Sequence, residues 1–283
     1  MESKPLDLEV FDFKRHNPNF DGLDSNKYSL TSPFTNMCNK IIPTELIQAL
    51  RTAQRVVVLT GAGTSAESGV PTFRDAQTGL WSRYDPKELA TPKAFRRNPR
   101  LVWEWYSWRR ELVAKAQPNP GHLALVQMQN CVPELTLITQ NVDGLHQRAG
   151  NKSVIELHGN LTRTKCADGG YLVDSWALTA EIPPRCPHCG GLLRPDVVWF
   201  GESLPEKTLS QAMAAIRQCD LFFSIGTSGL VHPAASLPFK ALEYGAKLVE
   251  INPENTPLTP RMDIVLYGKA GQILPVIMIN CKL

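Results

Sequence analysis

The sequence predicts an α/β fold: a Rossmann-like, doubly wound parallel sheet with a smaller inserted zinc-ribbon-like module and a helical insert. Three observations lead to this prediction. Short apolar or β-branched segments alternate with helical segments, which is typical of βαβ units and of a sheet covered on both faces. A glycine-rich turn follows the first such strand, as in dinucleotide-binding folds. Between Asn160 and Pro195 the pattern gives way to Cys, Gly and Pro, which indicates a small inserted module.

The strands and helices can be placed in order. Residues 1–42 form an N-terminal extension without helical or strand periodicity. A short helix is predicted over residues 44–50, and residues 55–60 are a β-branched run typical of a buried parallel strand. Further strands are predicted over residues 135–139, 154–157, 221–225 and 247–251, and helices over about 120–130, 206–218 and 233–245. The helical, aromatic insert covers about residues 75–118, and the cysteine-containing module about 160–195.

The composition is that of an ordinary globular protein. Of the 283 residues, 43% are hydrophobic and 20% are charged, a balance that excludes disordered and fibrous chains. Apolar runs stay well short of the roughly 18 residues of a membrane span, so we expect no membrane partner. The net charge of +3 comes from scattered Lys and Arg residues, which argues against a nucleic-acid partner.

The N-terminal residues and the cysteines both favour a cytoplasmic protein. Four acidic residues lie within the first twelve positions, unlike a signal peptide or an acid-poor transit peptide. The seven cysteines are odd in number, and only Cys186 and Cys189 are closely spaced. This usage favours free thiols or a metal in a reducing compartment over a disulfide framework.

The turn after the first strand has the sequence Gly61-Ala62-Gly63-Thr64-Ser65-Ala66. This fits the G-x-G-x-x-A pattern, in which glycines let the backbone approach a pyrophosphate and the next helix directs its N–H groups at it. The alternative is a tight strand-to-helix turn without a ligand. Two other strands end in small or polar residues, at 226–228 and 252–254, which favours the ligand site. A hydride-transferring unit would continue into a second strand with an acidic end, but this chain continues into Pro71-Thr72-Phe73-Arg74.

Four motifs follow one another along the chain. They are Gly61-Ala62-Gly63-x-Ser65-x-x-Ser68-Gly69-x-Pro71-x-Phe73-Arg74, Gln140-Asn141-x-Asp143-x-Leu145-His146, His158-Gly159 and Gly226-Thr227-Ser228. Together they resemble the sirtuin family of NAD-dependent protein-lysine deacylases, over roughly residues 44–283. The resemblance implies a catalytic domain over residues 43–283 in which NAD is consumed as a co-substrate, with release of nicotinamide and O-acyl-ADP-ribose.

The resemblance also implies the residues that bind and act on NAD. The implied cofactor-binding residues are Gly61, Ala62, Gly63, Ser65, Ala66, Phe73, Arg74, Trp81, Gln140, Asn141, Val142, Asp143, Gly226, Thr227, Ser228, Asn252, Pro253, Glu254 and Ala270. His158 and Asn141 are the implied catalytic residues. In this scheme His158, with an ordinary pKa near 6.5, takes a proton from a ribose hydroxyl at neutral pH. Asp143, beside Val142, accepts a carboxamide N–H of nicotinamide, and Phe73 shields the reacting sugar from water.

Structural interpretations of these residues remain beside the functional ones. A histidine at a strand end, such as His158, is usually a hydrogen-bonded or partly exposed residue. Asp143 could be a helix N-cap, a position that Asp favours. His146 is expected to pack or to cap a helix. The motif context favours the functional role for His158 and Asp143 only.

A helix within the aromatic insert suggests the acyl group. Tyr106 and Arg109 are three residues apart and therefore share one helix face. In sirtuins of the desuccinylase type, class III, a Tyr-x-x-Arg pair recognises the terminal carboxylate of succinyl- or malonyl-lysine, and the segment 90–95 resembles the same subtype. The alternative is an amphipathic helix with its arginine in solvent.

Two segments resemble those that hold the substrate peptide in this family, residues 198–202 and 229–231. An acyl-lysine substrate would pair with them as an extended strand. The implied substrate-binding residues are Tyr106, Arg109, Val198, Phe200, Gly201, Glu202 and Val231.

The metal site of the family is altered here. Cys186-Pro187-His188-Cys189 has zinc-knuckle spacing, and sirtuins carry another Cys-x-x-Cys some twenty residues earlier. In Cys166-Ala167-Asp168-Gly169, glycine takes the place of the fourth thiolate. Structural zinc therefore stays open: Asp168 or His188 completes the site, or the module folds without metal around Trp176 and the prolines.

Two other functions use the same pocket. An NAD glycohydrolase or ADP-ribosyltransferase would pass the ribosyl group to water or to another nucleophile. A non-catalytic NAD or ADP-ribose sensor is disfavoured by the presence of Asn141, Asp143 and His158. The sequence predicts no particular target protein or oligomeric state.

Overall fold

The computed structural model describes residues 42–72, 84–177 and 181–281. Residues 1–41 of the predicted extension lie outside these ranges. Within them, no helix has both the length and the apolar character needed to cross a membrane.

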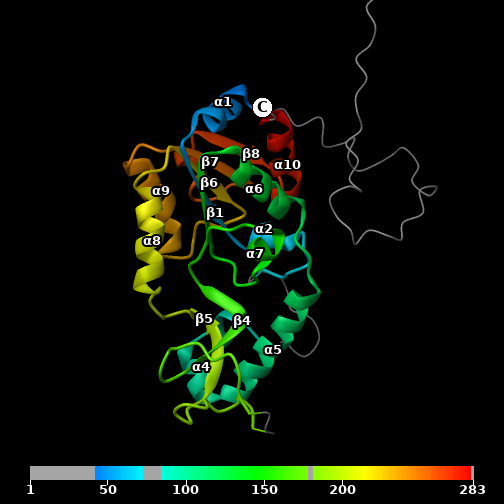
Figure 1. Ribbon diagram of the computed structural model, residues 1–283, viewed down its shortest axis with the longest axis vertical. Coiled ribbons are helices and arrows are strands. Elements are labelled where there is room, and N and C mark those ends of the chain that lie inside the picture. Colours follow the sequence, from blue (N-terminus) through cyan, green and yellow to red (C-terminus); the bar gives the residue numbers. More distant parts are fainter. Residues whose placement is uncertain (1–41, 73–83, 178–180, 282–283) are drawn as a thin grey trace, which may run out of the picture. The chain divides into compact units, whose positions relative to one another are not determined.

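A six-stranded parallel sheet forms the centre of the described part of the chain (Figure 1). Its strands are β1 (Arg55–Thr60), β2 (Glu134–Thr139), β3 (Val154–Glu156), β6 (Leu221–Ile225), β7 (Lys247–Asn252) and β8 (Ile264–Tyr267). They lie in the order β3-β2-β1-β6-β7-β8, with Val58 of β1 opposite both Leu137 of β2 and Phe223 of β6. The chain moves outward from β1 to β3 and then continues on the other side of β1. The strand order therefore reverses between β1 and β6, where such sheets bind ligands.

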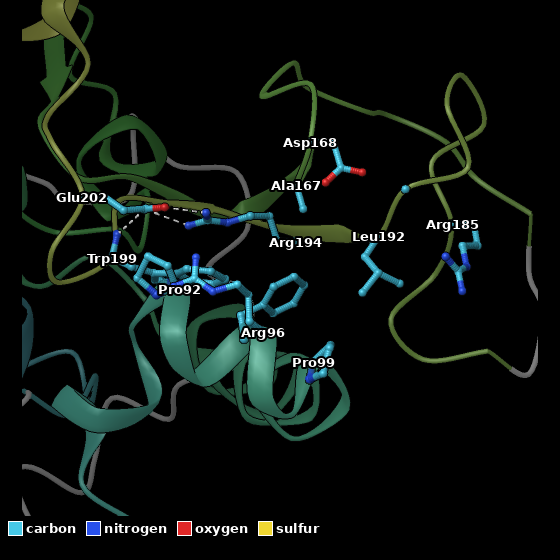
Figure 2. Close-up of a pocket in the computed structure, with 12 residues that line it drawn as sticks. Pro92, Arg96, Pro99, Ala167, Asp168, Arg185, Leu192, Arg194, Trp199 and Glu202 are labelled. Atoms are coloured by element: carbon cyan, nitrogen blue, oxygen red, sulfur yellow. Dashed lines mark hydrogen bonds and ion pairs between the residues drawn. The ribbon is translucent and has the colours of Figure 1, made fainter.

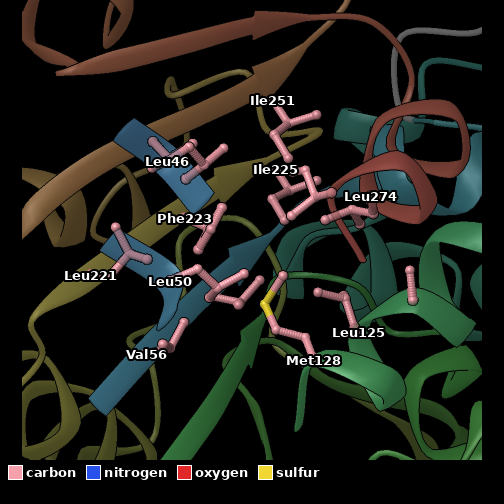
Figure 3. Packing of buried hydrophobic residues seen from close by; sticks show 14 of the residues in the cluster. Leu46, Leu50, Val56, Leu125, Met128, Leu221, Phe223, Ile225, Ile251 and Leu274 are labelled. Carbon is pink, nitrogen blue, oxygen red and sulfur yellow. The ribbon is translucent and has the colours of Figure 1, made fainter. Parts of the chain in front are cut away.

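Both faces of the sheet are buried because the strand side chains alternate. Val56 and Val58 of β1 contribute to one apolar cluster, and Val57 and Leu59 contribute to another. The first cluster is covered by α1 (Thr44–Thr52), α6 (Pro120–Cys131) and α10 (Ala270–Cys281); Figure 3 shows Leu46, Leu125 and Leu274 of these helices beside the strands. The second cluster is covered by α8 (Glu206–Ile216) and α9 (Leu237–Glu243). Helices on both faces make the sheet doubly wound.

A smaller layer is built from the two inserts. Strands β4 (Gly159–Cys166) and β5 (Leu193–Val197) pair antiparallel, and the cysteine-containing loop connects them. The helical insert contains α3 (Pro86–Leu89), α4 (Pro92–Arg97) and α5 (Pro99–Lys115). Each of these helices starts with Pro after an Asp, Thr or Asn whose side chain accepts a backbone N–H, a favourable helix start. Trp105 and Tyr106 of α5 pack in one cluster with Leu161 of β4 and Val197 of β5.

The predicted fold class is confirmed, and the five predicted parallel strands are found within one residue at each end. The predicted helix over 233–245 is instead a 3-10 turn, Ala234–Ser236, followed by the short α9. Strand β8 and helix α10 were not predicted. The remaining elements are α2 (Ala62–Ala66), α7 (Leu145–Ala149) and a 3-10 turn at Thr259–Arg261.

Candidate active site

Two glycine turns pack against each other where the strand order reverses. The amide of Gly63, after β1, donates to the carbonyl of Gly226, after β6, at 2.8 Å. A Cβ at Gly63 would lie 2.8 Å from that same carbonyl oxygen. Gly226 has φ +59°, and a Cβ there would lie 2.5 Å from the amide nitrogen of Thr64. Glycine is thus required at these positions for the two turns to meet.

Predicted residues from two further strand ends converge on these turns. Nε2 of Gln140, after β2, donates to Oγ1 of Thr227 at 2.9 Å. Nδ2 of Asn252, at the end of β7, donates to the carbonyl of Thr227 at 3.1 Å. Nδ2 of Asn141 donates to Oγ of Ser65 at 3.0 Å. One hydrogen-bonded group therefore links the ends of β1, β2, β6 and β7.

Asp143 lies in this group as a buried carboxylate, 4% exposed. Burial raises its pKa, whereas hydrogen bonds from the Leu145 amide and the Ser65 hydroxyl and the charges of Arg109 and Arg148 lower it. The N-cap interpretation is wrong for this residue. Gly144, with φ +70°, occupies the N-cap of α7, and Asp143 precedes it while accepting the Leu145 amide at 2.9 Å.

His158 follows β3 and is half-buried. Its Nδ1 lies 3.0 Å from the carbonyl oxygen of Gln140. Because a carbonyl only accepts, Nδ1 carries the proton, and Nε2 keeps a lone pair. Burial lowers the pKa of His158, and the bond to Gln140 opposes this shift. The ring is therefore neutral at pH 7 and can act as a base through Nε2.

His122 and His146 form a second layer behind the polar group, with ring centroids 4.7 Å apart. Burial lowers the pKa of His122 to about 4; burial, together with the neighbouring His122, lowers that of His146 to about 3. Nε2 of His146 lies 2.9 Å from Oγ1 of Thr60, so this ring packs, as expected. The sequence motifs did not single out His122, because its capping box with Asn119 lacks the usual Glu or Gln at the third helical position.

The proton positions around Ser65 follow from its neighbours. Nδ1 of His122 accepts the Asn119 amide, so Nε2 of His122 carries its proton and faces Oγ of Ser65 at 3.4 Å. The Ser65 hydroxyl also accepts from Asn141. Its own proton is left for the carboxylate of Asp143, with which it is hydrogen-bonded. Ser65 thus orients both Asn141 and Asp143.

Tyr106 and Arg109 of α5 are both buried, with 1% and 8% exposure. The alternative that Arg109 extends into solvent is therefore wrong. The hydroxyl of Tyr106 accepts from Nε1 of Trp199 at 3.0 Å, and burial raises its pKa to about 12. Burial lowers the pKa of Arg109, opposed by the charges of Tyr106 and Asp143. The Arg109 guanidinium also lies 5.2 Å from the centroid of the Trp105 ring.

The first predicted peptide segment is fixed by an ion pair beneath it. Arg194 of β5 forms two bonds with the Glu202 carboxylate, at 2.6 and 2.9 Å, and stacks 3.3 Å from the Trp199 ring centroid. Figure 2 shows these side chains at one end of a cavity of about 540 Å³. That cavity borders the cysteine module and lies apart from the glycine turns. Glu202 also accepts the Trp199 amide, so its carboxylate holds the segment in shape.

The side chains of Phe200 and Leu230, one on each predicted peptide segment, are exposed. Val198 is joined to the candidate base, because its amide donates to the carbonyl of His158 at 2.9 Å. Gly201 and Val231 lie on the same two segments.

Ser228, Pro253 and Glu254 continue the turns after β6 and β7, and Ala270 begins α10. Phe73, Arg74 and Trp81 lie outside the described residues.

The thiols of Cys166, Cys186 and Cys189 lie within 4.8 Å of one another. Zinc sites take three or four such ligands at about 2.3 Å, so the cluster fits a zinc ion. Asp168 and His188, the two predicted substitutes for the fourth thiolate, do not belong to this group of mutually close ligand atoms in the described part of the chain.

The sequence and the structure were compared with known proteins. The Sir2 family profile matches residues 61–233. An NAD-dependent protein deacylase of Aquifex aeolicus is 57% identical over 217 residues, which cover 76% of this chain and 90% of the relative. NAD-dependent protein deacylase 1 of Pseudomonas aeruginosa is 50% identical over 238 residues, covering 81% and 95%.

Solved structures agree with this comparison. A Sir2 homologue in complex with NAD superposes with a TM-score of 0.80 at 45% identity, over 86% of this chain and 94% of the other. A complex of Sir2 with a p53 peptide and NAD+ superposes with a TM-score of 0.76 at 31% identity, over 84% and 98%. The chain therefore belongs to the Sir2 family.

Proposed function

We propose that this chain is an NAD-dependent protein-lysine deacylase that prefers acyl groups ending in a carboxylate, such as succinyl and malonyl, over acetyl. The observation that carries the proposal is the burial of the Arg109 guanidinium on the same helix as the buried Tyr106, where the charge of Asp143 opposes the lowering of its pKa. An acyl-recognition group at Arg109 would then act near a nucleotide-binding group at Asp143. The products would be nicotinamide, the free lysine and O-acyl-ADP-ribose.

NAD supplies the ribose carbon that receives the acyl oxygen as nicotinamide leaves. The described residues fit such a substrate, because Gln140, Asn141 and Asp143 gather amide and carboxylate groups at the ends of parallel strands. Asp143 accepts the carboxamide N–H of nicotinamide. Asn141 and Gln140 hold ribose hydroxyls and an ordered water. The backbone of the turns after β1 and β6 faces the phosphates.

His158 is the proposed general base. Its Nδ1–H is fixed on the Gln140 carbonyl, which orients the ring and leaves Nε2 to take a ribose hydroxyl proton. A positioned base of this kind contributes on the order of 10²–10⁴ to a rate. Because burial lowers the pKa of His158, the ring stays neutral and ready to accept at cytoplasmic pH.

Arg109 is the proposed carboxylate receptor, together with Tyr106. The fold has already removed this guanidinium from water, so an acyl carboxylate would meet a pre-oriented, desolvated cation. A charge-assisted hydrogen bond contributes about 1.5–3 kcal/mol, which corresponds to a tenfold to hundredfold preference over acetyl. An acetyl group offers no partner for this charge.

The acyl-lysine peptide would lie extended between residues 198–202 and 229–231. Backbone pairing of this kind tolerates many sequences, and pockets for alternate side chains add selectivity. The rigid support of the first segment by Arg194 and Glu202 supports this role. Residues 43–283 would form the catalytic domain and residues 1–42 an extension.

A reducing, cytoplasmic location belongs to the same proposal. The six cysteines in the described part of the chain, at 131, 166, 186, 189, 219 and 281, are all free thiols. Fractionation of the native cells, followed by immunodetection, would test the location.

Nicotinamide release tests the activity. The protein is incubated with NAD alone, with a succinyl-lysine peptide, and with the matched acetyl-lysine peptide. Deacylation requires nicotinamide release that depends on the peptide. The proposed acyl preference requires that this release be faster with the succinyl peptide than with the acetyl peptide. Equal release without peptide would indicate a glycohydrolase, and no release in any arm would indicate a binding protein.

A further inference from the structure

The cysteine cluster contains a fourth polar atom that is not a cysteine. The hydroxyl of Tyr171 lies 3.1 Å from Sγ of Cys186, and Sγ of Cys166 and Sγ of Cys189 lie 3.4 Å apart. We propose that Tyr171 is the fourth ligand, beside the three cysteines, of a metal site that takes zinc or a similar divalent ion. The site replaces the usual four thiolates with three thiolates and one phenolate.

Tyr171 occupies the space that a side chain at position 169 would need. A Cβ at Gly169 would lie 2.1 Å from Cε1 and 2.7 Å from Cδ1 of the Tyr171 ring. A cysteine at 169 and the phenol in this place therefore exclude each other. With glycine at position 169, the Tyr171 ring can bring its hydroxyl to the thiols.

The backbone directs Tyr171 back toward the thiols. The amide of Gly170 donates to the carbonyl of Cys166 at 3.0 Å, and Gly170 has φ +70°. The amide of Cys166 donates to the carbonyl of Tyr171 at 3.0 Å. The amide of Gly169 in turn donates to Sγ of Cys166 at 3.3 Å. This tight turn fixes Cys166 and Tyr171 side by side.

The two other candidate donors make contacts outside the ligand group. The carboxylate of Asp168 covers Gly191, since a Cβ there would lie 2.1 Å from its Oδ2. The ring of His188 packs edge-on against Tyr171, with centroids 5.6 Å apart. Neither joins the three thiols in the group of mutually close ligand atoms among residues that the structure describes. The Tyr171 hydroxyl, in contrast, is within hydrogen-bonding distance of one thiol.

The ligand set is chemically sufficient for zinc. Tetrahedral sites accept S, N and O donors, with Zn–S near 2.3 Å and Zn–O near 2.0–2.2 Å. Ligands must be deprotonated to bind, so metal entry releases the remaining thiol protons and the phenol proton to water. Metal binding needs no oxidant or reductant, because the metal and its ligands keep their oxidation states. A Zn–phenolate bond then takes the place of the hydrogen bond between the phenol and Cys186.

Metal titration of the full chain tests the proposal. Purified wild type and the variants Tyr171→Phe, Gly169→Cys and Asp168→Asn are stripped of metal and titrated with Zn²⁺ against a chelator. Removing a supporting residue of a metal site lowers affinity roughly 10–100-fold, so losing a ligand in Tyr171→Phe should cost at least about tenfold. Asp168→Asn should match the wild type, and Gly169→Cys should bind at least as tightly as the wild type.

Spectroscopy gives a readout that does not depend on activity. Zn²⁺ should induce a tyrosinate absorption change in wild type and in Asp168→Asn but not in Tyr171→Phe. Co²⁺ spectra should show a tetrahedral site whose bands move in Tyr171→Phe, while circular dichroism confirms that the fold is kept. The proposal fails if Tyr171→Phe keeps the wild-type affinity and Co²⁺ spectrum, or if wild type binds no metal while Gly169→Cys does.

Discussion

The hydroxyl of Ser65 and the side-chain amide of Asn141 lie 3.0 Å apart and join the turn after β1 to the turn after β2. Ser65 also faces His122 at 3.4 Å and is hydrogen-bonded to Asp143. One small side chain therefore sets the orientation of an amide and of a carboxylate that would both contact NAD.

Replacing Ser65 with Ala should weaken catalysis more than it weakens the fold. Asn141 and Asp143 lose their shared partner, and a drop of about tenfold or more in kcat/KM for NAD is expected, equivalent to about 1.4 kcal/mol. Nicotinamide release with the succinyl peptide measures this. Ser210→Ala, on the exposed side of α8, is the matched control, and equal behaviour of the two variants would contradict the role of Ser65.

The pH dependence of deacylation should report His158. The base acts in its neutral form, and burial lowers its pKa from 6.5. Activity should therefore persist as the pH falls through 6.5 and decline only below it. The acidic limb of kcat/KM measures this pKa in the free enzyme. His158→Gln should remove the limb and lower the rate on the order of 10²–10⁴-fold; a limb retained in that variant would assign it to another group.

Arg109→Met should lower the rate of desuccinylation much more than the rate of deacetylation. Loss of the guanidinium removes the partner of a succinyl carboxylate, so desuccinylation should fall tenfold to hundredfold, while deacetylation changes much less. Rates with matched succinyl and acetyl peptides give the ratio. Arg100→Met, at an exposed ion pair on the same helix, is the control. Equal losses of rate with both peptides would contradict the role of Arg109 in binding the acyl carboxylate.

His122 should make the fold sensitive to acid. Its pKa in the folded protein is about 4 and its ordinary value is 6.5, so below pH 6.5 the unfolded chain binds a proton that the folded chain does not. Its contribution to stability is complete above pH 6.5 and is lost as the pH falls toward 4, at up to about 1.4 kcal/mol per pH unit. Urea unfolding between pH 7.5 and 5 measures the slope.

His122→Gln should flatten that slope, whatever its effect on the absolute stability. His232→Gln carries the same substitution at an exposed position and serves as the control. If both variants retain the wild-type slope, His122 is not a source of the acid sensitivity.

Gly226→Ala should destabilise the protein more than Gly245→Ala. Both glycines have positive φ, +59° and +87°, so both variants carry backbone strain. Only at Gly226 does the new Cβ meet backbone, 2.5 Å from the Thr64 amide nitrogen, whereas Gly245 has open space. Overpacking of this kind costs about 1–3 kcal/mol. Denaturant midpoints compare the two, and equal shifts would show that the contact is relieved.

Five of the six strands of the sheet could be predicted because their burial on both faces leaves continuous apolar runs. Helix α10 escaped prediction for a related reason: it is apolar on most sides and contains Pro275, so it shows neither amphipathic periodicity nor an unbroken helical pattern. Strand β8 has four residues at the sheet edge, too few for a periodic signal.

The residues of the site also divide into those that the sequence could predict and those that it could not. Gln140, Asn141 and His158 stand directly after strands, so their meeting follows from topology. The contacts of Ser65 with His122 depend on packing between α2 and α6, which local sequence does not encode. Tyr171 lies outside the Cys-x-x-Cys spacing, and only the turn at Gly170 brings its hydroxyl to the thiols.

The hydrogen bond from the Val198 amide to the His158 carbonyl joins the backbone of the proposed peptide segment to the backbone of the proposed base. A peptide that docks poorly on residues 198–202 would tilt the imidazole as well as bind weakly. Such an enzyme would reject wrong targets partly through slow turnover, and so would spare its coenzyme from futile breakdown.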